Sequence, residues 1–476
     1  MLNTTVATIL SLVSSLALSV LPANAAAEEG ITKSEILLGA SFPQTGGLAP
    51  HHQDFFIGAK AYFDYLNSKG GIHGRSIRLI LMDDGGSVNK TVSNTASLLM
   101  IDKVFALFNS APKTAAHVAM LRAGALAKRN IPNLAVTAPF SGLSDASKYP
   151  TTFQVNGNQK QEFKSLVQFY ENSLSASPLY PTLPDDDIGL DFEYLKNALG
   201  KKIVPGVGRI SNIPYELPYA LNEKSGKFEP RQTGELVILS LWPQHNSFSG
   251  KTLVVSELQP LLVRGSSISS SANNFLVANT KTRNIYANFN MPLYTDTSDP
   301  FIAFFTSVFR QFVPTRDFSL EINVSDGSKS AFNYVSQQMF EGANAAYVVA
   351  QAIAAIGPVP TRTALMSYLR TQSKTISTAT FSPLNYSSTS NIGDSVQYIA
   401  KYDGTKWVKH SDFYQINPDG TSIKTVTPQR IPLLPNGMPV MKLTNSIVKK
   451  IFCVKGMVNR EVSGIDPVCP KGFRQK

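Results

Sequence analysis

The sequence predicts an α/β protein with doubly wound parallel sheets, and three observations support this prediction. The first third of the chain alternates short β-rich runs with amphipathic helical stretches, joined by short connections. That alternation is typical of βαβ units, in which helices cover both faces of a parallel sheet. The composition is globular, with 43% hydrophobic and 16% charged residues. A chain of 476 residues is long enough for two domains, or for one large unit with a split core.

Hydrophobic periodicity places the individual elements. Apolar residues that alternate indicate strands, and apolar residues three and four apart indicate helices. Up to residue 155 we expect strands at 35–40, 76–82, 104–108 and 134–136, and helices at 54–67, 89–100 and 117–128. The pattern then restarts with a helix at 160–173 and a Pro- and Asp-rich loop at 177–187. Strands at 236–242, 252–255 and 284–290, helices at 300–312 and 336–356, and a hairpin at 397–408 complete the prediction.

The N-terminus has the pattern of a secretory signal peptide. An apolar run, Val6–Leu21, is followed by small residues at Ala23 and Ala25, which fit an A-x-A cleavage site. The run is too short and too rich in serine for a membrane span. We therefore expect residues 1–25 to be removed and the mature chain to begin at Ala26, in the periplasm or another cell-envelope space. No cysteine stands at this site to carry a lipid anchor.

The two cysteines of the chain, Cys453 and Cys469, both lie in the last segment. In an exported protein they can form one disulfide, and two free thiols are the alternative. A zinc site would need more ligands than this segment offers, since it contains no histidine. Residues 445–476 are therefore expected to form a basic, disulfide-stapled tail that contacts an anionic surface of the cell envelope. A tail that is merely stapled remains the plainer alternative.

The net charge of +11 raises the question of a nucleic-acid partner. No RNP-type aromatic motif, zinc-finger spacing or basic helix accompanies the charge, and the basic residues are spread along the chain. We therefore expect no nucleic acid among the partners.

The stretch from Gly30 to Lys148 resembles the type I periplasmic solute-binding proteins of the branched-chain amino-acid (Leu/Ile/Val) class, which are receptors of ABC importers. The order and spacing of several short segments carry the resemblance, rather than any one of them. These segments are Gly30–Thr32, Ile36–Ala40, Phe42–Ala49, Gly58–Asn67, Gly70–Arg75, Asp83–Gly85, Asp102–Ala106 and Ile131-Pro132. The resemblance is patchier in the second half, where it returns at 187–192, 300–312, 342–354 and 381–408.

The resemblance implies two doubly wound lobes joined by a hinge of three crossing segments, with the ligand bound between them. Transferred to this chain, the first lobe would hold residues 30–152 and 290–380. The second lobe would hold residues 156–288 and 384–440. The implied function is that of a receptor that closes on a small solute and presents it to a membrane permease.

Ligands of open α/β sheets bind outside the carboxyl ends of the strands. Ser110 is a candidate N-cap there, with Pro112 in the first helical turn, so the free N–H groups of that helix would suit a carboxylate. The expected contacts are Thr45, His51, Ser110, Ala111, Thr114, Thr137, Ala138, Ser141, Asp187 and Ile188. The alternatives are structural: Ser110 would only cap its helix, Thr137 and Ser141 would be ordinary turn residues, and His51 would be solvated.

Two departures from the family leave the ligand open. Ile188 stands where many members carry an aromatic residue, and Lys113 lies in a loop that often holds only small hydroxyl residues. No acidic residue can be assigned to pair an ammonium group; Asp187, Glu257 and Asp296 are the candidates. A buried ammonium without such a partner would be costly. An amino acid, an amide or a related organic acid each remain possible ligands.

Catalytic patterns are absent from the sequence. It contains neither a G-x-S-x-G elbow nor an H-E-x-x-H motif. Gly250–Thr252 matches the end of a phosphate loop, but His245 stands where the first glycine belongs. The pair Asp83-Asp84 imitates a carboxylate pair, although in a βαβ unit it more plainly ends a strand and begins a turn. We expect no enzyme, no cofactor and no metal. The alternative to an importer receptor is an envelope-associated sensory or scaffold protein with an altered pocket.

Overall fold

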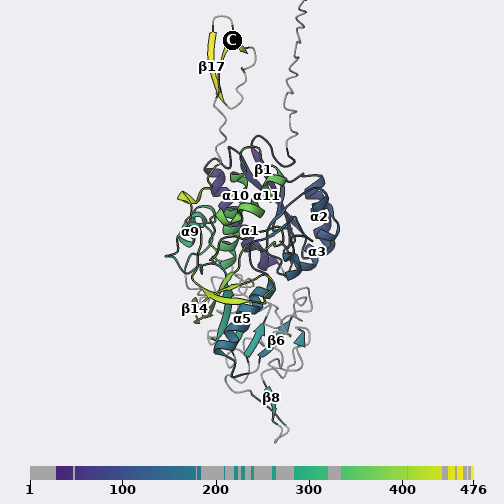
Figure 1. Cartoon of the computed structure of the whole chain (residues 1–476), viewed down its shortest axis with the longest axis vertical. Helices are drawn as coiled ribbons and strands as arrows, with labels where there is room; N and C mark the ends of the chain where they lie inside the picture. The colour runs from purple at the N-terminus through teal and green to yellow at the C-terminus, as the bar shows by residue number, and fades with distance from the viewer. Residues whose placement is uncertain are drawn as a thin grey trace, which may run out of the picture.

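The computed structural model describes residues 28–46, 49–177, 179–183, 208–209, 219–222, 227–230, 237–240, 260–263, 284–319, 334–404, 406–441, 449–455, 458–464, 469 and 473–475. Two lobes lie end to end in this part of the chain (Figure 1). The expected signal peptide and the strand expected at 252–255 lie outside the described residues. Among the helices described, none combines the length and the hydropathy that a membrane span requires.

The first lobe contains a parallel sheet of five strands in the order β2-β1-β3-β4-β5. The strands are β1 (Glu35–Phe42), β2 (Ser76–Asp83), β3 (Ala106–Phe108), β4 (Asn133–Val136) and β5 (Thr152–Gln154), and the helices between them are α1 (Ala49–Ser68), α2 (Val88–Met100), α3 (Thr114–Arg122) and α4 (Ala125–Lys128). This alternation confirms the predicted parallel α/β class. The single helix expected at 117–128 is wrong, because Gly124 at φ 70° separates α3 from α4.

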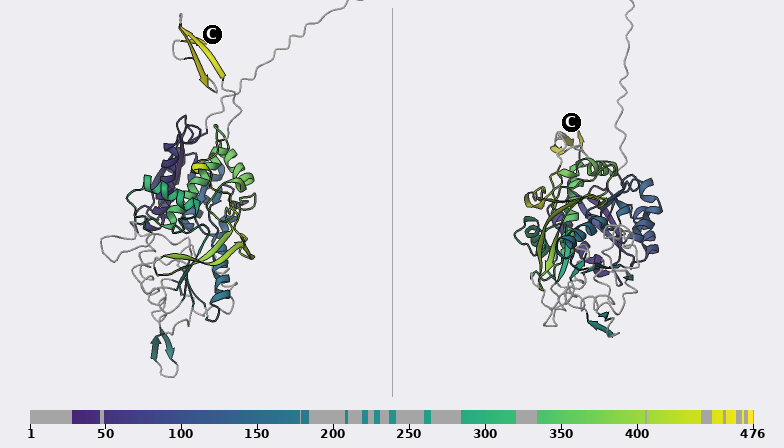
Figure 2. Two further views of the ribbon diagram at one scale, coloured as in Figure 1. Left: turned by 90° about the vertical axis from the view of Figure 1, so that its left-hand side faces the viewer. Right: turned by 60° about the horizontal axis from the view of Figure 1, so that its bottom comes forward.

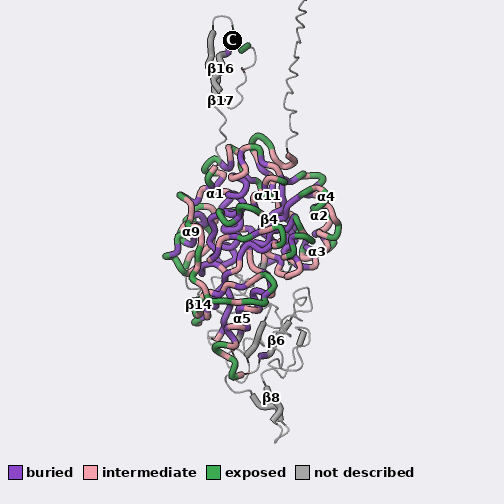
Figure 3. The backbone as a smooth tube through the Cα atoms, in the orientation of Figure 1, coloured by how far each residue is buried: buried purple, intermediate pink, exposed green. Residues whose placement is uncertain are grey.

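Three later helices complete the first lobe: α9 (Pro300–Phe312), α10 (Gln337–Ala355) and α11 (Arg362–Gln372). Helix α10 is buried along nearly its whole length and crosses α1 at two glycines. A Cβ added to Gly58 would lie 1.9 Å from the Met339 carbonyl oxygen, and one added to Gly342 would lie 1.8 Å from that of Phe55. The missing side chains therefore let the two backbones touch, and Figure 3 shows buried chain running through the middle of this lobe.

The second lobe contains a mixed sheet in the order β15-β14-β13-β12-β11-β10-β6-β7. Its strands are β6 (Leu179–Leu183), β7 (Gly208–Arg209), β10 (Val237–Ser240), β11 (Leu261–Val263), β12 (Ile285–Phe289), β13 (Val396–Tyr402), β14 (Trp407–Ile416) and β15 (Ile423–Val426), and α5 (Gln159–Ser173) packs on it. The strands from β7 to β12 are parallel, and β13 to β15 add an antiparallel edge. The loop expected at 177–187 is therefore wrong where β6 lies, since β6 pairs with β10.

The segments that join the lobes lie side by side. The chain crosses from β5 into α5, from β12 into α9, and from the region after α11 into β13. Backbone hydrogen bonds connect the first and third crossings, from the Gln154 nitrogen to the Asn391 oxygen (2.9 Å) and from the Gly393 nitrogen to the Gln154 oxygen (2.9 Å). The second crossing bonds to the first through the side chains of Asn290 and Asn156, at 3.2 Å.

A fourth crossing follows β15 and corrects the expected end of the second lobe at residue 440. Residues 429–438 return to the first lobe, where the hydroxyl of Tyr62 donates to the Gly437 oxygen at 2.9 Å and that of Tyr65 to the Asn436 oxygen at 2.6 Å. Leu434 and Met438 pack on the same core. The apolar side chains Leu433, Leu434 and Met438 of this stretch are partly buried against the core of the first lobe, which no local pattern in the sequence reveals.

Two smaller sheets lie outside the two main ones. Strands β8 (Tyr219–Asn222) and β9 (Lys227–Pro230) form a hairpin, and β16 (Lys449–Lys455), β17 (Val458–Gly464) and β18 (Arg474–Gln475) form the sheet of the tail. Figure 2 shows this tail sheet apart from both lobes. A disulfide joins Cys453 to Cys469, which confirms the expected pairing.

Candidate functional site

The predicted contact loops of the first lobe meet at the carboxyl ends of β1, β3 and β4. This position follows from the parallel sheet, because all of its strands end at the same edge. Ser41, near the end of β1, connects two of the loops: its nitrogen donates to the Ser110 hydroxyl (3.0 Å), and its carbonyl oxygen accepts from the Ala111 nitrogen (2.8 Å). The sheet therefore fixes the loop after β3 directly beside the end of β1.

Thr45 is held by Asp83 at the end of the neighbouring strand. The Thr45 hydroxyl donates to one Asp83 oxygen at 2.6 Å, and the other oxygen accepts from the backbone nitrogens of Gln44 (2.8 Å), Thr45 (3.2 Å) and Gly85 (2.9 Å). The Thr45 hydroxyl and these backbone bonds lower the pKa of Asp83 to about 2 against a modest opposing effect of burial. Thr45 is thus a structural residue of its loop, and the pair Asp83-Asp84 ends a strand, as expected.

Ser110 does not cap a helix, which corrects the sequence prediction. Helix α3 begins four residues later, and its N-cap is Lys113, whose side chain makes no capping bond. Ser110 is fully buried, and the Asn133 side chain spans its backbone: the Ser110 nitrogen donates to Asn133 Oδ1 (3.2 Å), and Asn133 Nδ2 donates to the Ser110 oxygen (2.9 Å). The role of Ser110 is therefore to anchor the loop from inside.

The same loop has an unusual backbone. Asn109 and Ala111 both adopt left-handed conformations, with φ of 45° and 58°. The Asn109 side chain also holds the next loop, because its Oδ1 accepts from both the nitrogen and the hydroxyl of Thr137, each at 3.0 Å. Backbone strain of this kind is concentrated at functional sites in proteins. The Thr137 hydroxyl, like that of Thr45, is already occupied.

Thr114, the first residue of α3, behaves differently. It is 2% exposed, and its hydroxyl oxygen has no hydrogen-bond partner in the structure. One turn later His117 is fully buried; its Nδ1 lies 3.2 Å from the Ala111 oxygen, and its Nε2 has no partner. Burial lowers the pKa of His117 to about 4, so the ring is neutral at pH 7. With Nδ1 as the donor, Nε2 is an acceptor. The Thr114 hydroxyl oxygen and His117 Nε2, one turn apart on α3, are therefore two buried polar atoms without a hydrogen-bond partner.

Lys113 gives this end of the lobe a positive charge. Burial and the Lys113 charge together lower the pKa of His52 to about 4, so the Lys113 ammonium acts on the first turn of α1. The N-termini of α1 and α3 each present the positive end of a helix dipole. The combination favours an anionic group or a carbonyl oxygen of a ligand.

The remaining predicted contacts divide into three groups. His51 lies in the first turn of α1 and not in a loop, because that helix begins at Ala49. Ala138 is buried and accepts a hydrogen bond from the Gln154 side chain at 2.9 Å, while Ser141 begins a short 3-10 helix. Asp187 and Ile188, expected on the second lobe, lie outside the described residues.

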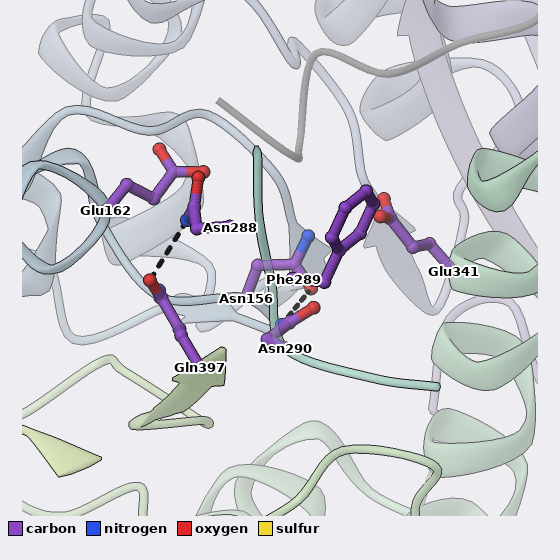
Figure 4. Close-up of a pocket in the computed structure, with 8 residues that line it drawn as sticks. Asn156, Glu162, Asn288, Phe289, Asn290, Glu341 and Gln397 are labelled. Carbon is purple, nitrogen blue, oxygen red and sulfur yellow. Dashed lines mark hydrogen bonds between the residues drawn. The ribbon is translucent and has the colours of Figure 1, made fainter. Parts of the chain in front are cut away.

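A small pocket lies at the hinge, between the two lobes (Figure 4). It is lined by polar side chains of the crossings and by one carboxylic acid from each lobe, Glu162 of α5 and Glu341 of α10. Figure 4 shows these two side chains on opposite sides, with Asn156 and Asn290 between them. The cavity of about 10 Å³ has room for about one water molecule.

Glu341 is 8% exposed and Glu162 is 5% exposed. Burial raises the pKa of Glu341 to about 8; the Glu162 charge acts in the same direction, and a hydrogen bond with Asn156 opposes it. Glu341 is therefore mostly protonated at pH 7 and can donate a hydrogen bond. In the part of the chain that the structure describes, no group of three or more His, Cys, Asp or Glu side chains forms a metal site.

The sequence reasoning missed His52, His117, Glu162 and Glu341. One of them had a recognisable signal: Glu341 is the sole charged residue of the long apolar stretch at 336–356. An isolated charge there points either to a partner or to a site. The two histidines carried no such signal, because a histidine on a helix is most often an ordinary packed or solvated residue.

Comparisons with known proteins agree with this geometry. Residues 35–192, about a third of the chain, match the model of a family described as periplasmic binding proteins. The matched region covers the first sheet, all three contact loops and α5. The expectation that the chain is not an enzyme agrees with this match, because the matched family consists of binding proteins. No protein of curated function matches the sequence.

Many solved structures share the fold. A substrate-binding periplasmic protein from Ralstonia solanacearum is 20% identical, with a TM-score of 0.61 over 79% of this chain and 100% of that one. A fatty acid ABC transporter substrate-binding protein from Thermomonospora curvata is 16% identical, with a TM-score of 0.60 over 83% and 96%. The branched-chain amino acid binding protein LivJ from Streptococcus pneumoniae, in complex with isoleucine, is 16% identical, with a TM-score of 0.56 over 79% and 100%. The chain therefore has the type I periplasmic binding protein fold.

Proposed function

We propose that this chain is an extracytoplasmic solute-binding receptor of an ABC importer. It holds a small polar solute between its lobes and presents the closed complex to a membrane permease. The fold supports the proposal, as do the functions of similar solved proteins, which include binders of an amino acid and of fatty acids. The expected signal peptide supports export to the periplasm or another cell-envelope space.

The observation that carries the proposal is the unsatisfied Thr114 hydroxyl at the start of α3. A buried hydroxyl without a partner costs free energy, and a ligand that bonds to it recovers that cost. Lys113 and the positive end of the α3 dipole stand beside it, so the matching ligand group is a carboxylate or a carbonyl oxygen.

Closure also requires a hinge that ligand can stabilise. A ligand favours the closed form by its differential affinity for that form over the open one. The pocket of Glu162 and Glu341 is lined by residues of both lobes. Its shape therefore depends on how the two lobes are placed relative to each other. The neutral Glu341 carboxyl and the surrounding amides suit a water molecule, for which the cavity of about 10 Å³ has room.

A thermal-shift screen of the purified protein tests the proposal. The screen uses amino acids, amides, urea and linear and aromatic carboxylic acids, including fatty acids. A solute at a hundredfold excess over its dissociation constant stabilises the fold by about 2.7 kcal/mol. Thr114→Val should reduce the affinity of a carboxylate ligand at least about tenfold, since a hydrogen bond to a charged group is lost.

The matched control is Thr45→Val, whose hydroxyl bonds inside the protein and should not contact the solute. If no solute class shifts the melting temperature of folded, ligand-free protein, the receptor proposal fails. An envelope-associated sensory or scaffold protein on the same fold is then the better description.

The tail supports contact with the cell envelope. Residues 449–476 carry seven lysines and arginines, Lys449, Lys450, Lys455, Arg460, Lys471, Arg474 and Lys476, against two acidic residues, Glu461 and Asp466. A compact basic sheet closed by a disulfide binds anionic surfaces with a strength that falls as salt rises. Co-sedimentation with anionic vesicles, with and without residues 445–476, tests this contact.

A further inference from the structure

The small hinge pocket places one carboxylic acid of each lobe beside the same cavity. Glu162 lies in the first turn of α5, in the second lobe, and Glu341 lies in α10, in the first lobe. Both side chains are more than nine-tenths buried and line the cavity, and Figure 4 shows them on opposite sides of it. The separation of the two acids therefore depends on how the lobes are placed, and it changes when the lobes move.

The rest of the pocket lining carries no charge that could compensate two carboxylates. Its other members, all of them described, are Asn156, Gly157, Asn288, Phe289, Asn290 and Gln397. The cavity of about 10 Å³ has room for about one water molecule, so little solvent screens a charge there. Two like charges in such a site repel each other strongly. With the lobes together, the pocket therefore favours one ionised acid over two.

The position of each acid on its helix decides which of the two holds a proton. The positive end of the α5 dipole lies beside Glu162 and favours a negative charge there. Glu341 lies beyond the first turn of α10, where the dipole has little effect. Burial raises the pKa of Glu341 to about 8, the Glu162 charge acts in the same direction, and a hydrogen bond with Asn156 opposes them. Glu341 is therefore the acid that is mostly neutral at pH 7.

The amides of the pocket connect this proton to the segments that join the lobes. The Asn156 side chain, on the first crossing, hydrogen-bonds to Glu341 and accepts from Asn290 of the second crossing at 3.2 Å. Asn288 of β12 donates to Gln397 of β13 at 2.9 Å. Ionisation of Glu341 therefore alters a hydrogen-bond network to which the hinge itself belongs.

We propose that Glu162 and Glu341 form a proton-controlled hinge, in which the lobes close with Glu341 protonated and ionisation of Glu341 drives them apart. Closure takes up one proton from the solvent, and opening returns it. The inference rests on the lobe movement of the proposed function and adds a regulator to it. Because it requires no solute, it can be tested on ligand-free protein, and its failure is distinguishable from failure of the receptor proposal.

The direction of the pH dependence follows from the environment of Glu341 in the two forms. In the open form the side chain is hydrated and farther from Glu162, so its pKa lies nearer the ordinary value of 4.5 than the value of about 8 in the closed form. Between these two pKa values closure binds a proton. The ratio of closed to open protein therefore falls as pH rises, by up to about tenfold per pH unit, and it levels off above pH 8.

The elements around the pocket carry further charged or titratable groups. They include His52 and Asp54 of α1, Arg310 of α9, Arg362 and Arg370 of α11, Lys160 and Lys164 of α5, Asp296 and Asp299 after β12, Asp394 of the third crossing, and Lys401 of β13. Among the described groups, the charge that contributes to the pKa of Glu341 is that of Glu162. Asp394 titrates in the same pH range, because burial raises its pKa to about 7. The test therefore compares proteins that all retain Asp394.

The test measures the placement of the lobes by single-molecule energy transfer in the full, ligand-free protein. Dyes are attached to Lys90→Cys in the first lobe and Ser173→Cys in the second, both at exposed positions. The native cysteines form a disulfide and do not react with the dyes. We expect the ratio of closed to open protein to fall by about tenfold between pH 6 and pH 8.

Three substitutions in the labelled protein separate the roles of the acids. Glu341→Gln keeps the side chain neutral, so closed protein should persist at pH 8. Glu162→Gln removes the facing charge but not the burial of Glu341, so the pH dependence should become weaker without disappearing. Glu171→Gln removes a charge from the same helix outside the pocket lining, and it should leave the full pH dependence in place.

Denaturant unfolding over the same pH range distinguishes a hinge from a buried acid without a role in movement. The folded pKa of Glu341 is raised, so its contribution to stability is complete below pH 4.5 and is lost as pH rises to 8. The wild type should therefore lose stability relative to Glu341→Gln between pH 6 and pH 8. If it does, yet the lobe populations of the two proteins respond equally to pH, the hinge proposal is overturned. Equal responses of Glu162→Gln and Glu171→Gln would overturn it as well, and this comparison does not depend on folding of Glu341→Gln.

Discussion

Thr45 and Thr114 follow adjacent strands of one sheet, Thr45 in the loop after β1 and Thr114 at the start of α3, yet their hydroxyl groups are in opposite states. The Thr45 hydroxyl donates to Asp83 at 2.6 Å and stands at the exposed side of its loop. The Thr114 hydroxyl is buried at the start of α3 and bonds to nothing in the protein. Both residues were predicted as ligand contacts from the same resemblance.

The difference shows how one type of residue can have different roles within one site. A hydroxyl whose bonds are complete fixes the shape of a loop, and a ligand would have to displace its partner to use it. A buried hydroxyl that lacks hydrogen bonds is not compensated for its burial inside the protein, so it is available to bond a ligand. The supports of each loop, Asp83 for one and Asn133 for the other, can be removed separately.

The largest expected effect comes from the support of the Thr114 loop. Asn133→Ala removes the two bonds to Ser110 and leaves a buried N–H and a buried carbonyl unpaired, so we expect a loss of about 3 kcal/mol in the free energy of unfolding. Denaturant unfolding measures this loss. Asn172→Ala, at an exposed position on α5, is the control and should change stability by less than about 0.5 kcal/mol. Equal stabilities for the two variants would show that the loop does not need Asn133.

A smaller effect distinguishes the two threonines themselves. Thr45→Val removes a bond to a carboxylate and should cost about 1 kcal/mol of stability. Thr114→Val removes no bond, so stability should stay the same or rise by up to about 1 kcal/mol, while affinity for a carboxylate solute falls. Thermal unfolding of ligand-free protein makes the measurement. A destabilised Thr114→Val variant would mean that its hydroxyl has an internal partner, and the contrast between the loops would be lost.

The smallest expected effect is the pH dependence of the Thr45 loop. Because the folded protein holds the pKa of Asp83 at about 2, below the ordinary value of 3.8, the ionised carboxylate stabilises the fold above pH 4, and this contribution disappears as pH falls from 4 to 2. Asp83 is exposed, so solvent screening limits the effect to about 1 kcal/mol or less. Asp83→Asn should flatten stability over this range relative to the wild type. Parallel curves would assign the acid sensitivity to other groups.

The first lobe could be predicted well because its signals are local. Alternating apolar residues gave the strands, and the spacing of apolar residues gave α1, α2, α9 and α10 within a few residues. The break between α3 and α4 was not predicted, because Gly124 was not recognised as the N-cap of a new helix. The return of residues 429–438 escaped for a different reason: it depends on contacts with Tyr62 and Tyr65, more than 370 residues earlier in the chain.

The sequence predicts where the candidate site lies, but not which of its side chains bind a ligand and which hold the loops in shape. Strand ends gave the three loops, since parallel strands must end at one edge. Whether a given hydroxyl is free depends on partners such as Asp83 and Asn133, which come from other strands and leave no mark on the loop sequence. Glu341 stands out in the sequence as a lone charge in an apolar stretch, but its pairing with Glu162 could not be predicted, because the two residues lie 179 positions apart (341 minus 162) and meet through folding alone.

The fourth crossing assigns the two ends of the folded body to the same lobe. Strand β1 begins in the first lobe, and the last residues before the tail pack there through Met438 and Met441. If the basic tail holds the protein to the envelope, the first lobe is the stationary member and the second lobe swings. The surface that reports occupancy to a membrane partner then lies on the lobe that carries no tether.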